Sequence, residues 1–230
     1  MVDTVGPLAQ MWRSVYRKAS EAAAATMAEL LRDHVYLFHR DLPGGGGGGG
    51  GGWVLLDEIG PLAATTLSPL AFAGIPQDAT HLWLHFEGRG TGSGLGTLGV
   101  QLNADAGAAN YSWTAHYVSP SATHSQTDAY ADAAVRVGNL ANGSQPAASL
   151  TTADVYVPHY AKNDARYQRI TADSVRDAVD GSGNDFPELW QAAGVWKSGA
   201  PVTAVRLFAF TSTTNFGAGT HVQLYGLRSA

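Results

Sequence analysis

The strongest constraint on this chain is a run of nine consecutive glycines, residues 44–52, directly after Pro43. Because glycine has no Cβ, such a run has the most backbone entropy to lose on ordering and is disfavoured inside an ordinary helix or sheet. A run of this kind is typical of a flexible linker. We therefore expect an N-terminal segment of residues 1–43, a linker of residues 44–52 and a domain of residues 53–230. In a second interpretation, three such runs pack as left-handed polyglycine helices of a fibrous trimer.

The N-terminal segment has the periodicity of an amphipathic helix. Pro7 suits a first helical turn, and apolar residues then recur at steps of three and four up to about residue 33. The glycine run separates this helix from the only sizeable core. We therefore expect the helix to dock on a larger assembly or on copies of itself, with a homotrimer preferred, rather than to pack on its own domain. The expected anchor and oligomer interface is Leu8, Met11, Trp12, Val15, Tyr16, Met27, Leu30 and Leu31.

Beyond the linker, the apolar period changes to two. Residues 81–86 show it most clearly, with Leu82, Leu84 and Phe86 expected on one face of a strand and the intervening side chains on the other. About ten short strands punctuated by turn residues predict a mainly β fold, an antiparallel jelly-roll-like β-sandwich. We expect residues 119–132 to form a polar loop. The expected strands are residues 53–59 at a sheet edge, 65–72, 81–86, 98–103, 110–118, 133–138, 153–160, 166–176, 189–196, 202–210 and 221–227.

Composition limits the classes of partner. Charged residues make up 14% of the chain, against about 25% in soluble proteins, and the net charge is −5 without a basic stripe, which argues against nucleic-acid binding. The chain has no cysteine, so disulfides and thiolate metal sites are excluded. The N-terminus lacks the pattern of a signal peptide, and the longest run of small residues, 22–25, is too short to span a membrane. We expect synthesis in the cytosol without secretory processing.

Several strings resemble catalytic or metal motifs without meeting their structural requirements. Residues 94–99 match GxGxxG, but a strand follows where a dinucleotide site needs a helix. His81 and His85 would lie about 13 Å apart along a strand, too far for one ion. Turn capping explains the Asn and Asp side chains of residues 103–110, and no GxSxG elbow occurs. We expect no catalytic residue, no metal and no cofactor.

Two tryptophans are candidate binding residues. Trp83 and Trp113 lie in alternating strands, and Trp83 is expected on the face opposite Leu82 and Leu84. A tryptophan on the solvated face of a sandwich stacks on a sugar ring or is covered by a neighbouring subunit, and both interpretations stay open. For Trp113 the face depends on the strand register.

Five strings in the domain carry a resemblance to a known family through their order and spacing. The strings are FAGIPQ at residues 72–77, THLWL at 80–84, NADAGAANYSW at 103–113, and the closing NFGAGT at 215–220 with LYGL at 224–227. Together they resemble a β-structured domain found in virion proteins of tailed bacteriophages, especially phages of actinobacteria. The resemblance spans about residues 53–230. It implies a minor structural protein of the virion, often a tail fibre or receptor-binding component, which assembles in the host cytoplasm and brings no catalytic residues.

These expectations combine into one leading hypothesis and two alternatives. In the leading hypothesis, residues 1–43 attach a non-enzymatic protein to the virion, preferably its tail, and the domain binds a host-surface glycan or another virion protein. The first alternative is a decoration protein that stabilises the capsid. The second is a glycan depolymerase that uses two carboxylates. The sequence selects no pair among Glu58, Glu87, Asp105, Asp173, Asp177, Asp185 and Glu188.

Overall fold

The computed structural model describes residues 52–94, 96–119, 122–164, 166–179, 185–210 and 215–228, without the side chains of residues 119, 122–126, 179 and 185. The expected N-terminal helix, its eight interface residues and the glycines up to residue 51 lie outside the described residues. The helical anchor and the linker therefore stay predictions. Gly52, assigned to the linker from the sequence, opens the first strand.

The regular secondary structure in the described part of the chain consists of twelve β-strands. The strands are β1 (Gly52–Ile59), β2 (Leu70–Ala73), β3 (His81–Gly88), β4 (Gly96–Leu102), β5 (Tyr111–Ser119), β6 (Ala122–Asp132), β7 (Val135–Leu140), β8 (Thr151–Pro158), β9 (Gln168–Val179), β10 (Asp185–Trp196), β11 (Ala204–Ala209) and β12 (His221–Arg228). They form an eight-stranded sheet in the order β1-β12-β3-β8-β9-β10-β5-β6 and a four-stranded sheet in the order β2-β11-β4-β7. All pairings are antiparallel, which confirms the expected mainly β, antiparallel fold. Within the described ranges, no helix has the length and apolar character needed to cross a membrane.

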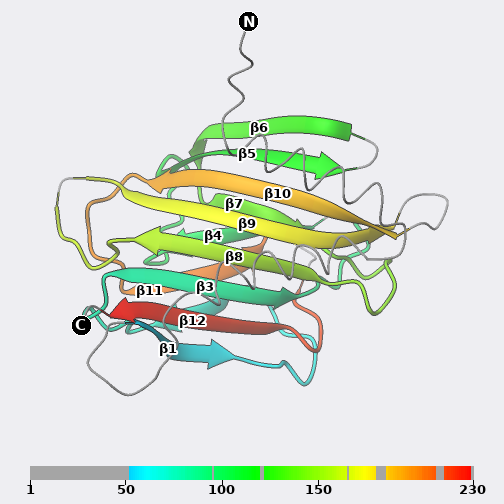
Figure 1. The fold of residues 1–230 in the computed structure, drawn as a ribbon, viewed down its shortest axis with the longest axis horizontal. Coiled ribbons are helices and arrows are strands. Elements are labelled where there is room, and N and C mark those ends of the chain that lie inside the picture. Colours follow the sequence, from blue (N-terminus) through cyan, green and yellow to red (C-terminus); the bar gives the residue numbers. More distant parts are fainter. Residues whose placement is uncertain are drawn as a thin grey trace, which may run out of the picture. The chain divides into compact units, whose positions relative to one another are not determined.

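Eight of the strands form nested pairs, in which strands from the start of the domain sequence pair with strands nearer its end. β1 pairs with β12, β2 with β11, β3 with β8, and β4 with β7. Two hairpins, β5–β6 and β9–β10, interrupt this nested series, and both extend the larger sheet beyond β8. Figure 1 shows the larger sheet running from β6 to β1, with β4, β7 and β11 behind it. Segments far apart in the sequence therefore lie side by side on the outer face of the larger sheet.

One hydrophobic core is built from the inner faces of both sheets. β3 and β8 alternate strictly between buried and partly exposed positions, so every second side chain enters the core. Leu82, Leu84 and Phe86 are buried, which confirms the faces predicted for residues 81–86. The smaller sheet contributes Leu70, Phe72, Leu98, Val100, Leu102, Val135, Val137, Val205 and Leu207.

Two strand predictions are wrong in part. Residues 119–132 were expected to form a loop, but β6 occupies most of this segment and pairs only with β5. One side of an edge strand is open to water, so a polar sequence without apolar alternation is stable there. The strand expected at residues 65–72 is short and begins only at Leu70. β1 lies at the sheet edge, as the sequence indicates.

Several polar groups are buried inside the domain, and two arrangements of them link different strands. Arg176 of β9 and Glu188 of β10 form an ion pair with an N–O distance of 2.7 Å, and the two side chains are only 7% and 8% exposed. Asn139 of β7 donates a second hydrogen bond to the same carboxylate, at 2.5 Å. The hydroxyl of Tyr111 bonds both backbone groups of Leu102, accepting from its N–H and donating to its carbonyl. The pairing of β4 with β7 ends at Val100, so the backbone N–H and carbonyl of Leu102 have no partner on β7. The hydroxyl of Tyr111 supplies their hydrogen bonds instead.

Candidate functional site

The outer face of the larger sheet carries a row of aromatic side chains. Tyr225 of β12, Trp83 of β3 and Tyr156 of β8 lie opposite one another in the strand register, so they form a row across three strands. The rings of Trp83 and Tyr225 are stacked with centroids 4.8 Å apart. Trp53 extends from the edge strand β1 to the same row, with its centroid 5.9 Å from Trp83 and 6.3 Å from Tyr156.

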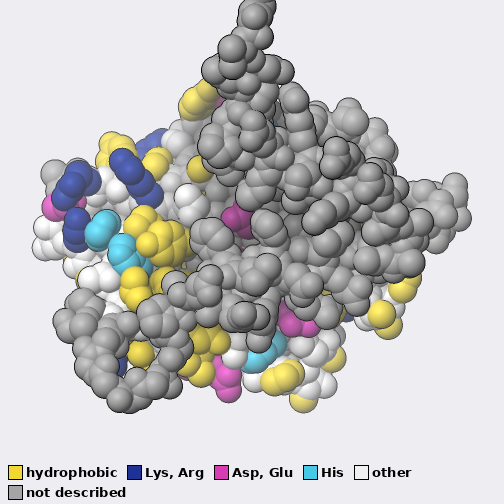
Figure 2. Space-filling view, viewed as in Figure 1, with side chains coloured by type: hydrophobic (Ala, Val, Ile, Leu, Met, Phe, Trp, Pro, Cys, Tyr) yellow, Lys and Arg dark blue, Asp and Glu magenta, His cyan; other side chains and the backbone are white. Residues whose placement is uncertain are grey.

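Two histidines continue this row toward the loop after β8. The ring of His81 stacks on that of Tyr156 at 5.5 Å, and the ring of His159 lies 4.7 Å from His81. Figure 2 shows hydrophobic side chains beside histidines and then Lys and Arg at the left of this face. The pKa of His81 is lowered below its ordinary value. The main cause is partial burial, and electrostatic repulsion from His159 and Lys162 adds to it. We call the following set the aromatic strip: Trp53, Trp83, Tyr225, Tyr156, His81 and His159.

A carboxylate beside the strip, on the same face of the sheet, fixes its central tryptophan. One Asp154 oxygen accepts a hydrogen bond from the indole N–H of Trp83 at 2.8 Å and lies 2.9 Å from Nδ1 of His85. Burial by itself lowers the pKa of His85, but the hydrogen bond and charge of Asp154, with the charge of Glu87, outweigh burial and raise it. Asp154 therefore holds two neighbouring rings of β3 in place, one of them part of the strip.

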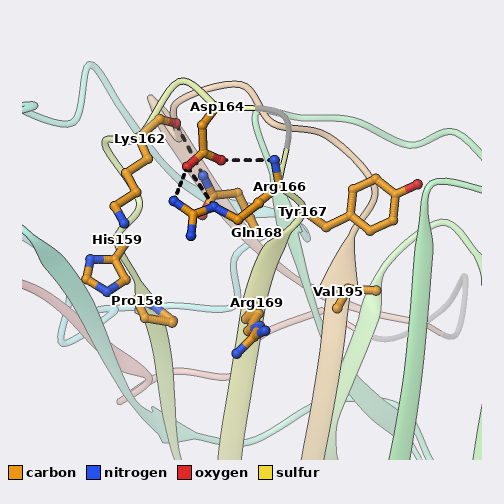
Figure 3. Close-up of a pocket in the computed structure, with 9 residues that line it drawn as sticks. All are labelled: Pro158, His159, Lys162, Asp164, Arg166, Tyr167, Gln168, Arg169 and Val195. Atoms are coloured by element: carbon orange, nitrogen blue, oxygen red, sulfur yellow. Dashed lines mark hydrogen bonds and ion pairs between the residues drawn. The ribbon is translucent and has the colours of Figure 1, made fainter.

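A basic cavity of about 680 Å³ adjoins the histidine end of the strip. It is formed where β8 ends, where β9 begins and where β10 ends, with residues 159–164 and 166–167 of the connecting loop as one wall (Figure 3). Three of its side chains are cationic, Lys162, Arg166 and Arg169, and one is anionic, Asp164. The cavity is lined by Pro158, His159, Lys162, Asp164, Arg166, Tyr167, Gln168, Arg169 and Val195.

The cations of the basic cavity are unequally paired. Arg166 donates two side-chain hydrogen bonds to Asp164, at 2.9 and 2.6 Å, and these hydrogen bonds lower the pKa of Asp164. Among the described residues, no carboxylate lies within ion-pair distance of Lys162 or Arg169. Figure 3 shows Lys162 extending from the loop toward His159, and Arg169 on β9 below it. The cavity therefore holds an excess of two positive charges at neutral pH in a chain of net charge −5.

The two tryptophans chosen from the sequence lie on opposite faces of the larger sheet. Trp83 is part of the aromatic strip. Trp113 faces the core, is only 5% exposed and donates its indole N–H to Asp132. The guanidinium of Arg136 covers its ring at 5.3 Å from the centroid. The idea that Trp113 stacks on a sugar is therefore wrong for the domain as described, because the register turns its ring inward.

Two of the carboxylates considered for other chemistry, Asp105 and Glu188, have structural roles. One oxygen of Asp105 accepts hydrogen bonds from the backbone of Gly107 and the amide of Asn110, and the other accepts from the indole of Trp196, which confirms turn capping. Glu188 belongs to the buried ion pair. Among the described side chains, no group of three or more His, Cys, Asp or Glu is placed to hold a metal ion.

Comparison with models of protein families, with curated proteins and with solved structures finds no match. The site therefore stands on its own geometry. Sequence reasoning missed Trp53, Tyr156 and Tyr225, although Tyr156 and Tyr225 each alternate with core aliphatics and so carried a visible signal. It also missed the basic cavity, whose cations are spaced irregularly along a loop and the start of β9 in an acidic chain.

Proposed function

We propose that this chain is a non-enzymatic structural protein of a tailed-bacteriophage virion, of the tail-fibre or receptor-binding type. In this proposal the N-terminal helix attaches the protein to other virion proteins as a homotrimer, the glycine run gives reach, and the β domain binds a glycan on the host surface. Several copies on one particle then convert weak binding at single sites into avidity.

We assign the domain as a jelly-roll-like sandwich. A jelly roll is a long antiparallel ribbon rolled up, so its eight strands pair first with last and continue inward. The nested pairs β1–β12, β2–β11, β3–β8 and β4–β7 follow this order, with the hairpins β5–β6 and β9–β10 inserted. This order supports the assignment, and jelly rolls are common in viral capsid and lectin domains.

The aromatic strip is the observation that carries the binding role. Aromatic side chains on the inner face of a sheet are explained by the core, but those of the strip point to the outer face. Clustered rings with polar edges suit the apolar face of a sugar ring together with its hydroxyl rim. Trp53, Tyr156 and His81 are each partly exposed. A sugar can therefore contact several rings at once without displacing core residues.

The test is binding of the purified full chain to an array of bacterial-surface glycans. Trp53→Ala and Tyr156→Ala each remove one ring of the strip and should weaken binding roughly 3- to 10-fold, the effect expected of one aromatic contact. Tyr130→Ala is the matched control, since Tyr130 is an 83% exposed aromatic on the far edge strand β6. Thermal unfolding shows whether each variant is folded.

Three results would overturn parts of this proposal. Wild-type protein that binds no glycan, or strip variants that bind as well as the control, would remove the receptor-binding role. Gold labelling that places the chain on the head of a particle would favour capsid decoration, whereas the proposal expects the tail. Release of reducing ends from a bound polysaccharide would favour the depolymerase.

A further inference from the structure

The basic cavity and the aromatic strip form one continuous surface. In the pairing of β3 with β8, the strip residue His81 lies opposite Pro158. In the pairing of β9 with β10, Arg169 lies opposite Val195. Pro158, Arg169 and Val195 all line the cavity. The strip residue His159 lines it as well. A ligand that lies along the strip therefore has its end at the cavity.

The size and charge of the cavity indicate what that end carries. Its volume of about 680 Å³ is in the range of small-molecule sites, about 300–1,000 Å³. Two of its three cations, Lys162 and Arg169, have no carboxylate partner among the described residues, whereas Arg166 is bonded to Asp164. Arginine binds carboxylate and phosphate groups through paired N–H donors, and lysine adds a point charge.

We propose that the glycan bound by this domain is acidic, and that its carboxylate or phosphate group occupies the basic cavity between Lys162 and Arg169 while its sugar rings lie on the aromatic strip. This inference rests on the proposed binding function and gives it a ligand class. The loop that follows β8 brings Lys162 to the cavity, and β9 supplies Arg169 from the sheet. The two cations therefore approach the anion from two different elements.

The inserted hairpin β9–β10, which extends the larger sheet, supplies part of the cavity. The cavity lies where β8, the last strand of the nested series in this sheet, meets the inserted hairpin β9–β10. Without that hairpin, the domain would lack Arg169, Val195 and one end of the loop that carries Lys162. The inserted hairpin thus adds a charged subsite to the strip.

The test uses the full chain on an array with three arms: saccharides with uronic acids, saccharides with phosphate groups, and neutral saccharides of similar length. The first two arms identify which anion is bound. We expect binding in at least one acidic arm and affinity that falls as NaCl rises, because salt screens contacts between charges. Lys162→Gln and Arg169→Gln should each weaken acidic binding at least about 10-fold. Arg206→Gln, a cation on the smaller sheet, is the control and should leave binding unchanged.

The outcomes separate this inference from the proposal on which it rests. Binding to neutral saccharides alone, weakened by Trp53→Ala but not by Arg169→Gln, would overturn the acidic ligand and leave the attachment function intact. Acidic binding that survives both cavity substitutions would also overturn it. Absence of binding in all three arms would overturn both claims.

Discussion

Substituting Glu188 by Gln should destabilise the domain strongly. The change keeps the shape of the side chain but removes the carboxylate bonded to the buried Arg176 guanidinium. Among the described residues, no group accepts a hydrogen bond from Nε of Arg176. It also places an amide N–H₂ opposite either Arg176 or Asn139, both of which donate to Glu188. The Arg176 guanidinium then remains charged without its carboxylate, although its side chain is only 7% exposed. Breaking a buried ion pair in this way costs about 3–5 kcal/mol.

The matched control is Asp164→Asn, which breaks the ion pair with Arg166 at the surface. There the side chains are 33% and 77% exposed, and a surface pair of this kind, screened by water, contributes little to stability. In urea denaturation, Glu188→Gln should therefore lose several times more free energy of unfolding than the control. The expected fall in Tm is roughly 6–20 °C, at about 2–4 °C per kcal/mol for a domain of this size.

A double variant separates charge burial from packing. Arg176→Met with Glu188→Leu removes both charges, and such replacements by apolar side chains are often neutral or stabilising. We expect it to recover most of the stability lost by Glu188→Gln. A single variant that unfolds like the Asp164→Asn control would refute the claim that the pair is buried, and a double variant less stable than the single would refute the role of the unpaired charge.

Three further predictions concern smaller parts of the structure. Tyr111→Phe removes the hydroxyl that bonds both backbone groups of Leu102 and should lower the free energy of unfolding by about 1–3 kcal/mol, a prediction that equal urea midpoints would contradict. Asp154→Asn should lower the pKa of His85 in an NMR titration, because burial then acts against a weaker opposing charge; an unchanged pKa would disprove the pairing. Asn103→Ala should destabilise by about 2 kcal/mol, since Asn103 has φ 51° and its side-chain oxygen accepts two backbone N–H bonds; a thermal unfolding curve matching wild type would count against this.

The sequence predicts individual strands well because burial alternates along them. Residues 81–86 fold with the expected faces, and residues 53–59 form an edge strand. The segment of β6 was missed because an edge strand needs no apolar alternation. Local pattern thus identifies buried strands more reliably than exposed ones.

The binding surface could be predicted only in part, because it depends on pairing between distant segments. The strip joins Trp53, Trp83, Tyr156 and Tyr225 from four strands, and their alignment follows from the nested pairing rather than from any local string. Trp83 lies between the buried Leu82 and Leu84 and points to the outer face, whereas Trp113 lies between Ser112 and Thr114 and points to the core. The basic cavity was hidden because an acidic overall composition does not show a local excess of cations.

The most direct test of the central claim is an NMR titration of the full chain with the tightest-binding saccharide, observing the indole N–H signals of its six tryptophans. The proposal predicts saturable shifts for Trp53 and Trp83, which lie on the outer face of the larger sheet, and no shifts for the inward-facing residues Trp113, Trp190 and Trp196. Saturable binding that leaves the signals of Trp53 and Trp83 unmoved would contradict the assignment of this face as the attachment surface.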